Sequence, residues 1–283
     1  MTGMPGVSVL RLLSERPKPT GAVCLALQQA EVRLGITGQV HALRGVDLSI
    51  RVGERVALVG SNGCGKSTLL RALHGLVPLC AGTLQQPGSP RIAMLFQRPH
   101  LLRLSVLNNI ALGLWLQGVP WRHTAGKARA ALQRVGMADL AQRNAKALSG
   151  GQLQRVALAR AWAMQPSVWL LDEPTASLDP QAKHEVEALI ADFCSEGSGT
   201  RPHGAQPHES TTADPDRRLV PPGPTTLVFT SHNLGQVKRL ASRVIYLERG
   251  RLLVDLPVHE FFHHERLQAI CPSAHFFLQG ESL

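Results

Sequence analysis

The sequence predicts an α/β fold, in which helices connect the strands of a largely parallel β-sheet and a glycine-rich loop follows one strand. Two observations predict it. Short apolar strands, of which 55–59 and 168–171 are the clearest, alternate with segments whose Leu and Ala residues recur every three or four positions. The first of these strands runs directly into a glycine-rich segment that opens a helix. A chain of 283 residues with 44% hydrophobic content can bury such a core.

The strands and helices can be placed in order along the chain. Residues 1–22 contain several Pro, Gly and Arg and are expected to form a loose leader. From 23 to 59 apolar and polar residues alternate, which predicts strands, with a turn at Gly53. The later elements are expected as a helix over 68–76, a strand over 91–96, mainly helix over 99–146, a helix over 152–164, a strand over 168–171, a helix over 180–194, a strand over 226–230, a helix over 234–242, and strands over 243–247 and 251–254.

Residues 195–224 depart from this order. They include six prolines and four glycines and no aromatic residue, so they cannot bury enough apolar surface to offset the entropy of ordering them. We expect a flexible surface insertion within the domain. Its histidines, His203 and His208, lack convergent ligands and are not expected to hold a metal.

The positive charge of the chain is concentrated in one stretch. Residues 91–160 contain eleven Lys or Arg and one acid, Asp139, and this difference of ten equals the whole net charge of +10. Three interpretations stay open: solvated helix faces, an anionic membrane surface, or nucleic acid.

Cysteine usage and hydropathy exclude other classes. The five cysteines are scattered, without zinc-ligand spacing or a disulfide framework, which is typical of a reducing compartment. No apolar signal core is found near the N-terminus. The best candidate for a membrane span, 101–116, is too short and is interrupted by Arg103, Asn108 and Asn109. We therefore expect that the chain does not cross a bilayer.

The segment Gly60–Ser67 matches the phosphate-binding pattern G-x-x-x-x-G-K-[ST]. Its glycines allow backbone conformations that turn successive N–H groups toward phosphate oxygens, and the following helix N-terminus adds partial positive charge. Lys66 is expected to reach the β- and γ-phosphates, and the Ser67 hydroxyl to bind Mg²⁺.

A pair of acids, Asp172 and Glu173, ends the strand 168–171. Phosphoryl transfer requires a partner for Mg²⁺ and a group that orients or deprotonates water, and we assign these roles to Asp172 and Glu173 respectively. Such a pair can also be an ordinary loop at a strand end. The preceding phosphate loop favours the catalytic interpretation.

A second glycine turn, Leu148–Gln152, reads Leu-Ser-Gly-Gly-Gln and opens another helix. It is a second anion-binding helix N-terminus, although it can also be an ordinary capped helix. Each chain thus carries one complete phosphate loop and one further anion-binding turn. Both would bind nucleotide if two subunits associate head to tail. Each nucleotide is then held between the phosphate loop of one subunit and Ser149–Gly151 of the other.

These motifs resemble those of the ATP-binding-cassette (ABC) ATPases, in order and in spacing, from about residue 25 to residue 270. The resemblance implies a P-loop NTPase core with a parallel sheet, an N-terminal antiparallel β subdomain and an inserted α-helical subdomain over 97–148, all within one domain over 23–283. It also implies that Gln97 senses Mg²⁺ and the attacking water, that Asp179 lies at a dimer seam, and that His232 contacts the γ-phosphate.

The expected site residues follow from the motifs and the resemblance together. The expected catalytic residues are Lys66, Gln97, Glu173 and His232. The expected ATP-binding residues are Gly60, Ser61, Asn62, Gly63, Cys64, Gly65, Lys66, Ser67, Thr68, Ser149, Gly150, Gly151, Gln152 and Asp179. The expected Mg²⁺ ligands are Ser67, Gln97 and Asp172.

The chain departs from the family pattern at the adenine site. Members usually carry an aromatic ring there, before the phosphate loop, whereas Leu34, or nearby Val32 or Val40, holds the place here. We expect weakened discrimination between ATP and GTP. Cys64 lies at a helix N-terminus, where a thiol can be reactive, which leaves redox control as a secondary hypothesis.

The resemblance also implies partners. We expect a homodimer, an integral membrane permease docked on the lobe 97–148, and an extracytoplasmic solute-binding protein, with the chain peripheral to the cytoplasmic face of the inner membrane. Import is favoured over export because separate ATPase subunits are the usual arrangement of bacterial importers. Segments 96–103, 260–262 and 277–281 look like ATPases of tungstate-type oxyanion uptake.

Two rival functions remain at this point. A soluble ABC ATPase acting on nucleic acid or ribosomes would also suit the basic stretch, but such proteins usually carry two cassettes, a long coiled coil or an extra binding domain. A kinase or other phosphotransferase would share the phosphate loop, and the Leu148–Gln152 motif argues against it.

Overall fold

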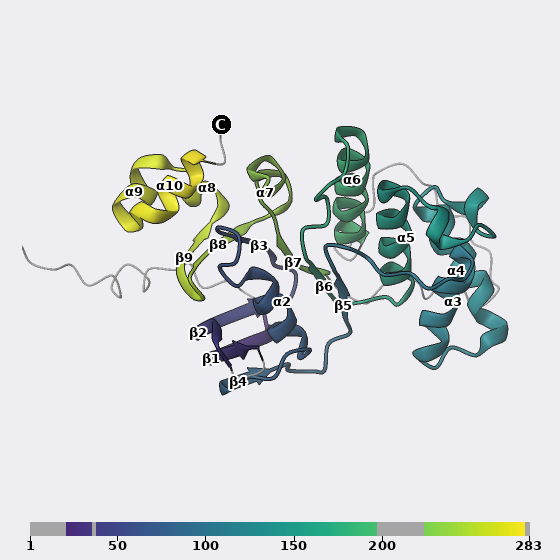
Figure 1. The fold of residues 1–283 in the computed structure, drawn as a ribbon, viewed down its shortest axis with the longest axis horizontal. Coiled ribbons are helices and arrows are strands. Elements are labelled where there is room, and N and C mark those ends of the chain that lie inside the picture. Colours follow the sequence, from purple (N-terminus) through teal and green to yellow (C-terminus); the bar gives the residue numbers. More distant parts are fainter. Residues whose placement is uncertain (1–20, 36–37, 197–223, 281–283) are drawn as a thin grey trace, which may run out of the picture.

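A computed structural model describes residues 21–35, 38–196 and 224–280. Two β-sheets lie on either side of one helix, and a helical lobe extends from one edge (Figure 1). The expected leader therefore lies outside the described residues except for its last two positions. Most of the expected insertion also lies outside them, and α6 continues to Glu196, two residues beyond its expected end.

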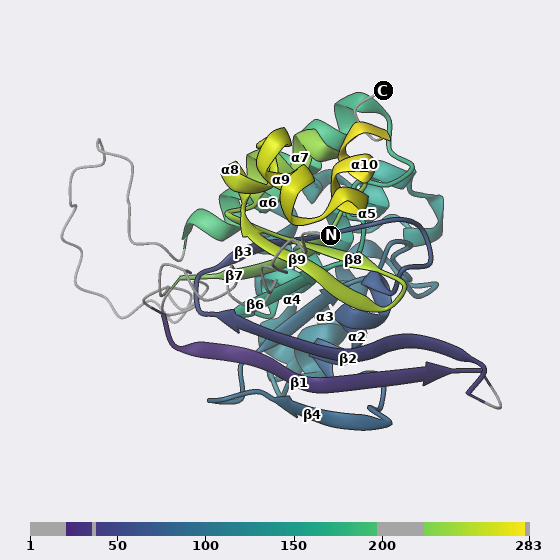
Figure 2. The same cartoon turned by 90° about the vertical axis from the view of Figure 1, so that its left-hand side faces the viewer.

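The smaller sheet is antiparallel and forms the layer seen at the bottom of Figure 2. It consists, in the order β2-β1-β4, of β1 (Val23–Leu34), β2 (Val40–Arg51) and β4 (Ala81–Gln85). The long hairpin β1–β2 agrees with the alternating pattern over 23–59. The third strand was not expected, because its short and mostly exposed sequence Ala-Gly-Thr-Leu-Gln carries no buried alternating face.

The larger sheet carries the site. Its strand order is β5-β6-β7-β3-β8-β9, and every pairing is parallel except that of the last strand with β8. Its strands are β3 (Arg55–Val59), β5 (Ile92–Leu95), β6 (Val168–Leu171), β7 (Thr226–Thr230), β8 (Arg243–Glu248) and β9 (Arg251–Pro257). Because the central strands are parallel, their carboxyl ends meet along one edge, and the residues after them come together.

Helix α2 (Lys66–His74) lies between the two sheets (Figures 1 and 2). It begins two residues before its expected start, directly at the end of the glycine loop. Its Leu69 and Leu73 are fully buried with Leu27 of β1 and Val228 of β7 in one apolar cluster. The phosphate loop is thus anchored between two packed layers.

The helical lobe contains α3 (Val106–Leu116) and α4 (Trp121–Arg134), followed by two short 3₁₀ turns, η1 (Ala138–Leu140) and η2 (Ala145–Ala147). Helix α5 (Gly150–Ala163) joins the lobe to the core and begins two residues before its expected start. It lies beside α6 (Pro180–Glu196), and Phe193 of α6 stacks between Trp162 and Trp169. The mainly helical stretch expected before the second glycine turn is therefore present.

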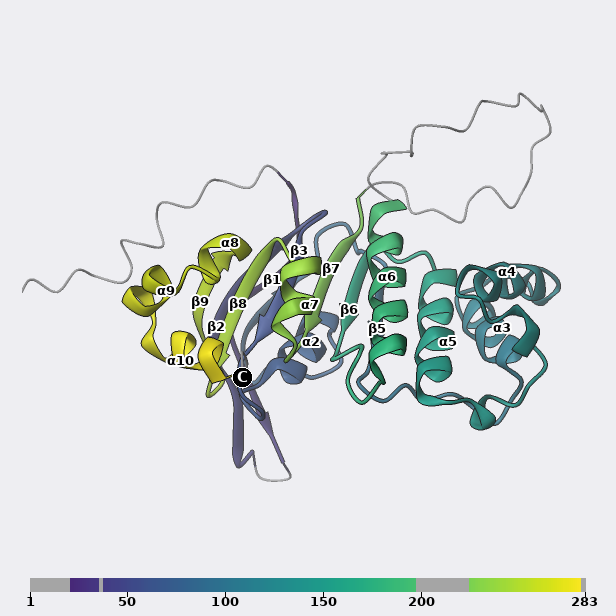
Figure 3. The ribbon, with the colours of Figure 1, turned by 90° about the horizontal axis from the view of Figure 1, so that it is seen from above.

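The C-terminal part returns to the far edge of the large sheet (Figure 3). Helix α7 (Leu234–Leu240) ends two residues before its expected end. Three short helices follow, α8 (Val258–Phe261), α9 (His264–Ile270) and α10 (Pro272–Gly280). They were not expected. Their buried Phe261, Leu267 and Leu278 complete the apolar core on that side. Within the described ranges, no helix combines the length and the apolar character that crossing a membrane requires.

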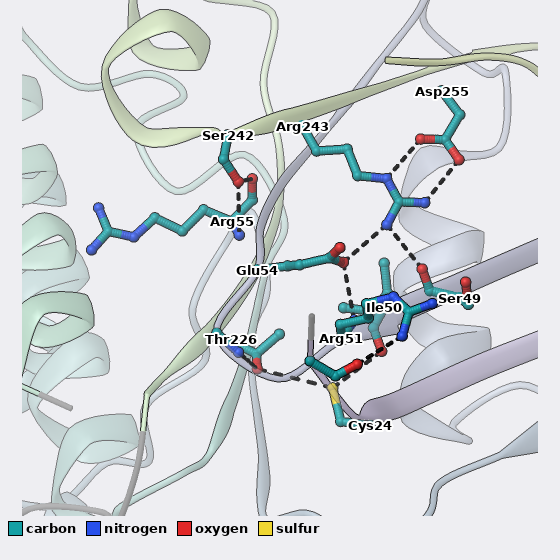
Figure 4. Close-up of polar contacts among 12 residues, drawn as sticks. Cys24, Ser49, Ile50, Arg51, Glu54, Arg55, Thr226, Ser242, Arg243 and Asp255 are labelled. Atoms are coloured by element: carbon teal, nitrogen blue, oxygen red, sulfur yellow. Dashed lines mark hydrogen bonds and ion pairs between the residues drawn. The ribbon is translucent and has the colours of Figure 1, made fainter. Parts of the chain in front are cut away.

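A cluster of largely shielded charged side chains, Arg243, Asp255 and Glu54, joins the two sheets (Figure 4). Arg243 of β8 forms a bidentate pair with Asp255 of β9, at 2.6 and 2.8 Å. Its remaining nitrogen donates to the Ser49 carbonyl of β2 and to Glu54 in the turn before β3, at 3.0 and 2.9 Å. Burial opposes the charge on Arg243, but the contacts with the two carboxylates together outweigh it and raise the pKa of the guanidinium.

Candidate nucleotide site

The phosphate loop follows β3 and requires glycine at two close approaches. Gly60 has φ 143° and Gly65 has φ 113°, in the region that side chains disfavour. A Cβ at Gly60 would lie 2.2 Å from the carbonyl oxygen of Leu247, and one at Gly65 would lie 2.6 Å from that of Ala42. No side chain caps the N-terminus of α2, so its first N–H groups remain available to a phosphate.

Lys66 lies at the bottom of this loop and is 6% exposed. Its Nζ donates to the carbonyl oxygens of Gly60 and Ser61, at 2.6 and 3.0 Å. These contacts hold the ammonium inside the loop, where a negatively charged phosphate can reach it. The position agrees with the role expected for this lysine.

Two of the three expected Mg²⁺ ligands lie together at the end of β6. The Ser67 hydroxyl donates to Oδ1 of Asp172 at 2.9 Å, and Asp172 is 3% exposed. Gln97, the third expected ligand, lines the same concavity of about 440 Å³ as Ser67 and Asp172. Hydroxyl, carboxylate and amide oxygens are the donors that Mg²⁺ prefers, so this set fits the expected ion.

The Glu173 carboxylate lies between two other expected residues. Gln97 donates through Nε2 to Oε2 at 2.8 Å, and Nε2 of His232 lies 3.2 Å from Oε1. The Glu173 backbone has φ 46°, which is uncommon for a side-chain-bearing residue, and its N–H donates to the Thr230 hydroxyl at 2.8 Å. Three residues separated widely in sequence are thereby brought to one point.

Most of these groups line a cleft of about 700 Å³, whereas Asp172 lines the smaller concavity. From the expected set it contains Asn62, Gly63, Gly65, Lys66, Ser67, Thr68, Gln97, Glu173 and His232. It also contains Leu34, Val40, His41, Ala42, Arg44, Arg249 and Gly250. The hairpin β1–β2 and the β8–β9 turn contribute these additional residues. Of them, only Leu34 and Val40 were singled out from the sequence, since the others belong to no motif.

The part of this cleft formed by the β1–β2 hairpin, where the adenine base is expected and which we call the base end, carries aliphatic side chains and no ring. No Phe, Tyr or Trp occurs in the chain before Phe96. Leu34 and Val40, paired across the β1–β2 hairpin, line the cleft, whereas Val32 is fully buried and does not.

The second glycine turn does not line the cleft. Ser149 caps α5: its hydroxyl accepts from the Gln152 N–H at 3.4 Å, and the Gln152 side chain accepts from the Ser149 N–H at 3.0 Å. Asp179 accepts from the Ala182 N–H at 2.9 Å at the start of α6. In Figures 1 and 3, α5 and α2 lie on opposite sides of β5 and β6.

The Cys64 side chain is turned away from the cleft into the apolar cluster around α2, and it is 4% exposed. Burial raises the pKa of this thiol, although Lys66 opposes the shift. A raised pKa means less thiolate at neutral pH, which argues against the redox hypothesis. Its expected contribution to nucleotide binding would have to come from the backbone.

Comparison with known proteins agrees with this geometry. The family model described as "ABC transporter" matches residues 43–176. The chain is 34% identical over 233 residues to the glutamine transport ATP-binding protein GlnQ of Escherichia coli, covering 77% of this chain and 86% of that protein. It is 35% identical over 223 residues to the aliphatic sulfonates import ATP-binding protein SsuB 1 of Agrobacterium fabrum, covering 78% and 71%.

Solved structures show the same fold. A putative metal-chelate type ABC transporter in an inward-facing conformation matches with a TM-score of 0.69 and 25% identity, covering 88% of this chain and 89% of that one. The dimeric ATP-binding cassette MJ0796 bound to ADP and Pi matches with a TM-score of 0.68 and 24% identity, covering 83% and 98%. The cleft and these relatives together establish that the chain belongs to the ATP-hydrolysing, ATP-binding subunits of the ABC transporters.

Proposed function

We propose that this chain powers an ABC importer of a small solute, as one of two ATPase subunits bound to a membrane permease. The observation that carries the proposal is the convergence of Lys66, Glu173 and His232 on one cleft that does not include the second glycine turn. Asp172 lies in the smaller concavity, which shares Ser67 and Gln97 with that cleft. Such a subunit hydrolyses ATP, and it needs a second copy to complete each site.

The chemistry follows from the contacts in the cleft. Lys66 and the N–H groups opening α2 hold the β- and γ-phosphates, while Glu173 accepts a proton from the attacking water. His232 and Gln97 hold that carboxylate in place. Ser67, Gln97 and Asp172 would hold Mg²⁺, which neutralises charge on the phosphates when bound.

The dimer follows from the position of Ser149–Gly151. This turn opens α5 and presents a helix N-terminus outside the cleft of its own chain. Gly151 has no room for a side chain, because a Cβ there would lie 2.9 Å from Cβ of Ala182. A head-to-tail pair places this turn against the γ-phosphate held by the other subunit, with Asp179 near the seam.

Gln97 connects the nucleotide to the surface where we place the permease. It lines both the nucleotide cleft and the smaller concavity, which also contains Phe96, Arg98 and His100. Phe96, which lines this concavity, is 41% exposed, and Leu102, two residues after His100, is 52% exposed. We propose that these exposed apolar side chains form the permease patch. A permease loop bound there would contact Gln97, so a movement of Gln97 on nucleotide binding or hydrolysis would reach the permease directly.

Several finer features belong to the same proposal. The solute is a small oxyanion of the tungstate type, delivered by an extracytoplasmic binding protein, and the subunit is peripheral to the cytoplasmic face of the membrane. A relative named for aliphatic sulfonate import and another named for phosphonate import make an anionic solute reasonable. The basic stretch suits the anionic lipids of that face.

The test is purification of the tagged chain from detergent-solubilised membranes of its own host. We expect an integral membrane protein to accompany the parent chain and to be lost with Leu102→Asp, which alters the exposed patch. Leu253→Asp, at a 41% exposed position on β9, is the matched control and should retain it. Nuclease-sensitive association with ribosomes or nucleic acid instead would support the soluble alternative and contradict the importer.

A further inference from the structure

We propose that Thr230 is a positioning residue for ATP hydrolysis, whose hydroxyl holds the carboxylate of Asp172 and the backbone of Glu173 in one arrangement. The inference rests on the roles proposed above for these two acids. Thr230 belongs to none of the motifs in the sequence, and it does not line the nucleotide cleft.

The contacts of the Thr230 hydroxyl define its role. Thr230 is the last residue of β7 and is fully buried. Its Oγ1 donates to Oδ1 of Asp172 at 2.9 Å and accepts from the Glu173 N–H at 2.8 Å. A hydroxyl has one donated hydrogen, and a carboxylate accepts only, so these two contacts fix its direction. One side chain therefore restrains both acids.

The parallel pairing of β6 and β7 explains why this threonine reaches them. Leu171 pairs with Phe229, so the next residue on each strand, Asp172 and Thr230, lie side by side where the strands end. Ser67 donates to the same Oδ1 from α2. Oδ2 of Asp172 has no hydrogen-bond partner within the described part of the chain, which leaves that oxygen available to an ion or a water.

The contact with Glu173 matters because its backbone is strained. A φ of 46° is costly for a residue with a side chain, by about 1–3 kcal/mol, and persists where the surroundings impose it. The Thr230 hydroxyl accepts the Glu173 N–H in this conformation. The side chain then projects between Gln97 and His232, where its carboxylate can meet the attacking water. Loss of the hydroxyl removes this restraint and that on Asp172 together.

The test compares Thr230→Val, which keeps the shape and removes the hydroxyl, with Thr230→Ser, which keeps the hydroxyl. Groups that orient metal ligands typically change metal affinity or activity by about 10- to 100-fold when removed. We expect Thr230→Val to lower kcat by about this factor with a smaller change in KM. The Mn²⁺ affinity of the nucleotide-bound protein, measured by electron paramagnetic resonance, should fall as well, while nucleotide binding in EDTA stays as in the parent.

Thr226→Val is the matched control, because Thr226 is a buried threonine at the other end of β7 whose hydroxyl accepts from the Gly53 N–H. It should cost stability without changing kcat or Mn²⁺ affinity, and Thr230→Ser should restore most of both. If Thr230→Val does not fold, Thr230→Ala carries the same test.

Parent-like kcat and Mn²⁺ affinity in Thr230→Val, or an equal loss of both in Thr226→Val, would overturn the proposal. The importer function fails separately, through the membrane purification, so the two outcomes are distinguishable.

Discussion

In the cleft, the functional side chains already contact other groups of the protein. Glu173 lies between Gln97 and His232, and Lys66 lies on the carbonyls of its own loop. Such mutual contacts fix each group close to the position that its chemistry requires, so less ordering remains to be done when a nucleotide binds.

The base end of the cleft supports a prediction at this scale. We expect the parent to bind ATP and GTP with similar affinity, because aliphatic Leu34 and Val40 offer no ring for stacking. Leu34→Tyr should tighten ATP binding about 5-fold or more, since stacking on an aromatic ring is worth about 1–3 kcal/mol per base. Titration calorimetry with both nucleotides measures the effect.

Val52→Tyr is the control, because Val52 is 43% exposed and does not line the cleft. It should leave both affinities unchanged. Strong ATP selectivity in the parent, or equal loss of ATP affinity in Leu34→Ala and Leu34→Asp, would contradict this account of the base site.

Between elements, the Arg243 cluster joins β8 and β9 to the β2–β3 turn (Figure 4). The exposed fraction of its side chains is 15% for Arg243, 14% for Glu54 and 6% for Asp255. Strand β8 pairs directly with the P-loop strand β3, and Glu54 immediately precedes β3, so the cluster supports the frame on which the site is built.

We expect Arg243→Met to lower the free energy of unfolding by about 3–5 kcal/mol, because two shielded carboxylates lose their partner. Urea denaturation measures the change. Arg251→Met, at an exposed position on β9, should change it by no more than about 0.5 kcal/mol. A loss below about 1 kcal/mol in Arg243→Met would show that the cluster contributes little beyond a surface ion pair.

For the whole molecule, the separation of the cleft from Ser149–Gly151 predicts an ATP-dependent dimer. Glu173→Gln should bind Mg-ATP, fail to hydrolyse it and run as a stable dimer in size-exclusion chromatography. Adding Ser149→Arg should return this variant to a monomer that still binds Mg-ATP, because the arginine occupies the space of the other subunit's phosphate while its own Lys66 is untouched.

Gln133→Arg, an exposed position on α4, adds the same charge elsewhere and should leave the dimer intact. Thermal unfolding checks the cost of the lost helix cap, which is about 0.5–2 kcal/mol. Hydrolysis by an obligate monomer at an unchanged rate, indifferent to Ser149, would end the dimer hypothesis.

Local order along the chain was sufficient for much of this protein. The loop Gly60–Ser67 can be recognised from the sequence because consecutive residues form it. The strand before Asp172 and Glu173 can be recognised because all of its residues are buried and apolar. Most helix and strand ends were predicted within two residues for the same reason, as the differences at α2, α5 and α7 show, whereas β9 runs to Pro257 rather than to the expected Val254.

Other features depended on which strands lie side by side. Thr230 meets Asp172 only through the register of β6 and β7, and His41, Arg44 and Arg249 reach the cleft from a hairpin and a turn that carry no motif. The pairing of two distant segments produces no periodic pattern in the sequence of either segment. A short exposed strand such as β4 likewise has no apolar face from which it could be predicted. The consecutive motifs therefore determined the expected chemistry and the family. Only the tertiary structure decided which further side chains, such as Thr230, contact the motif residues.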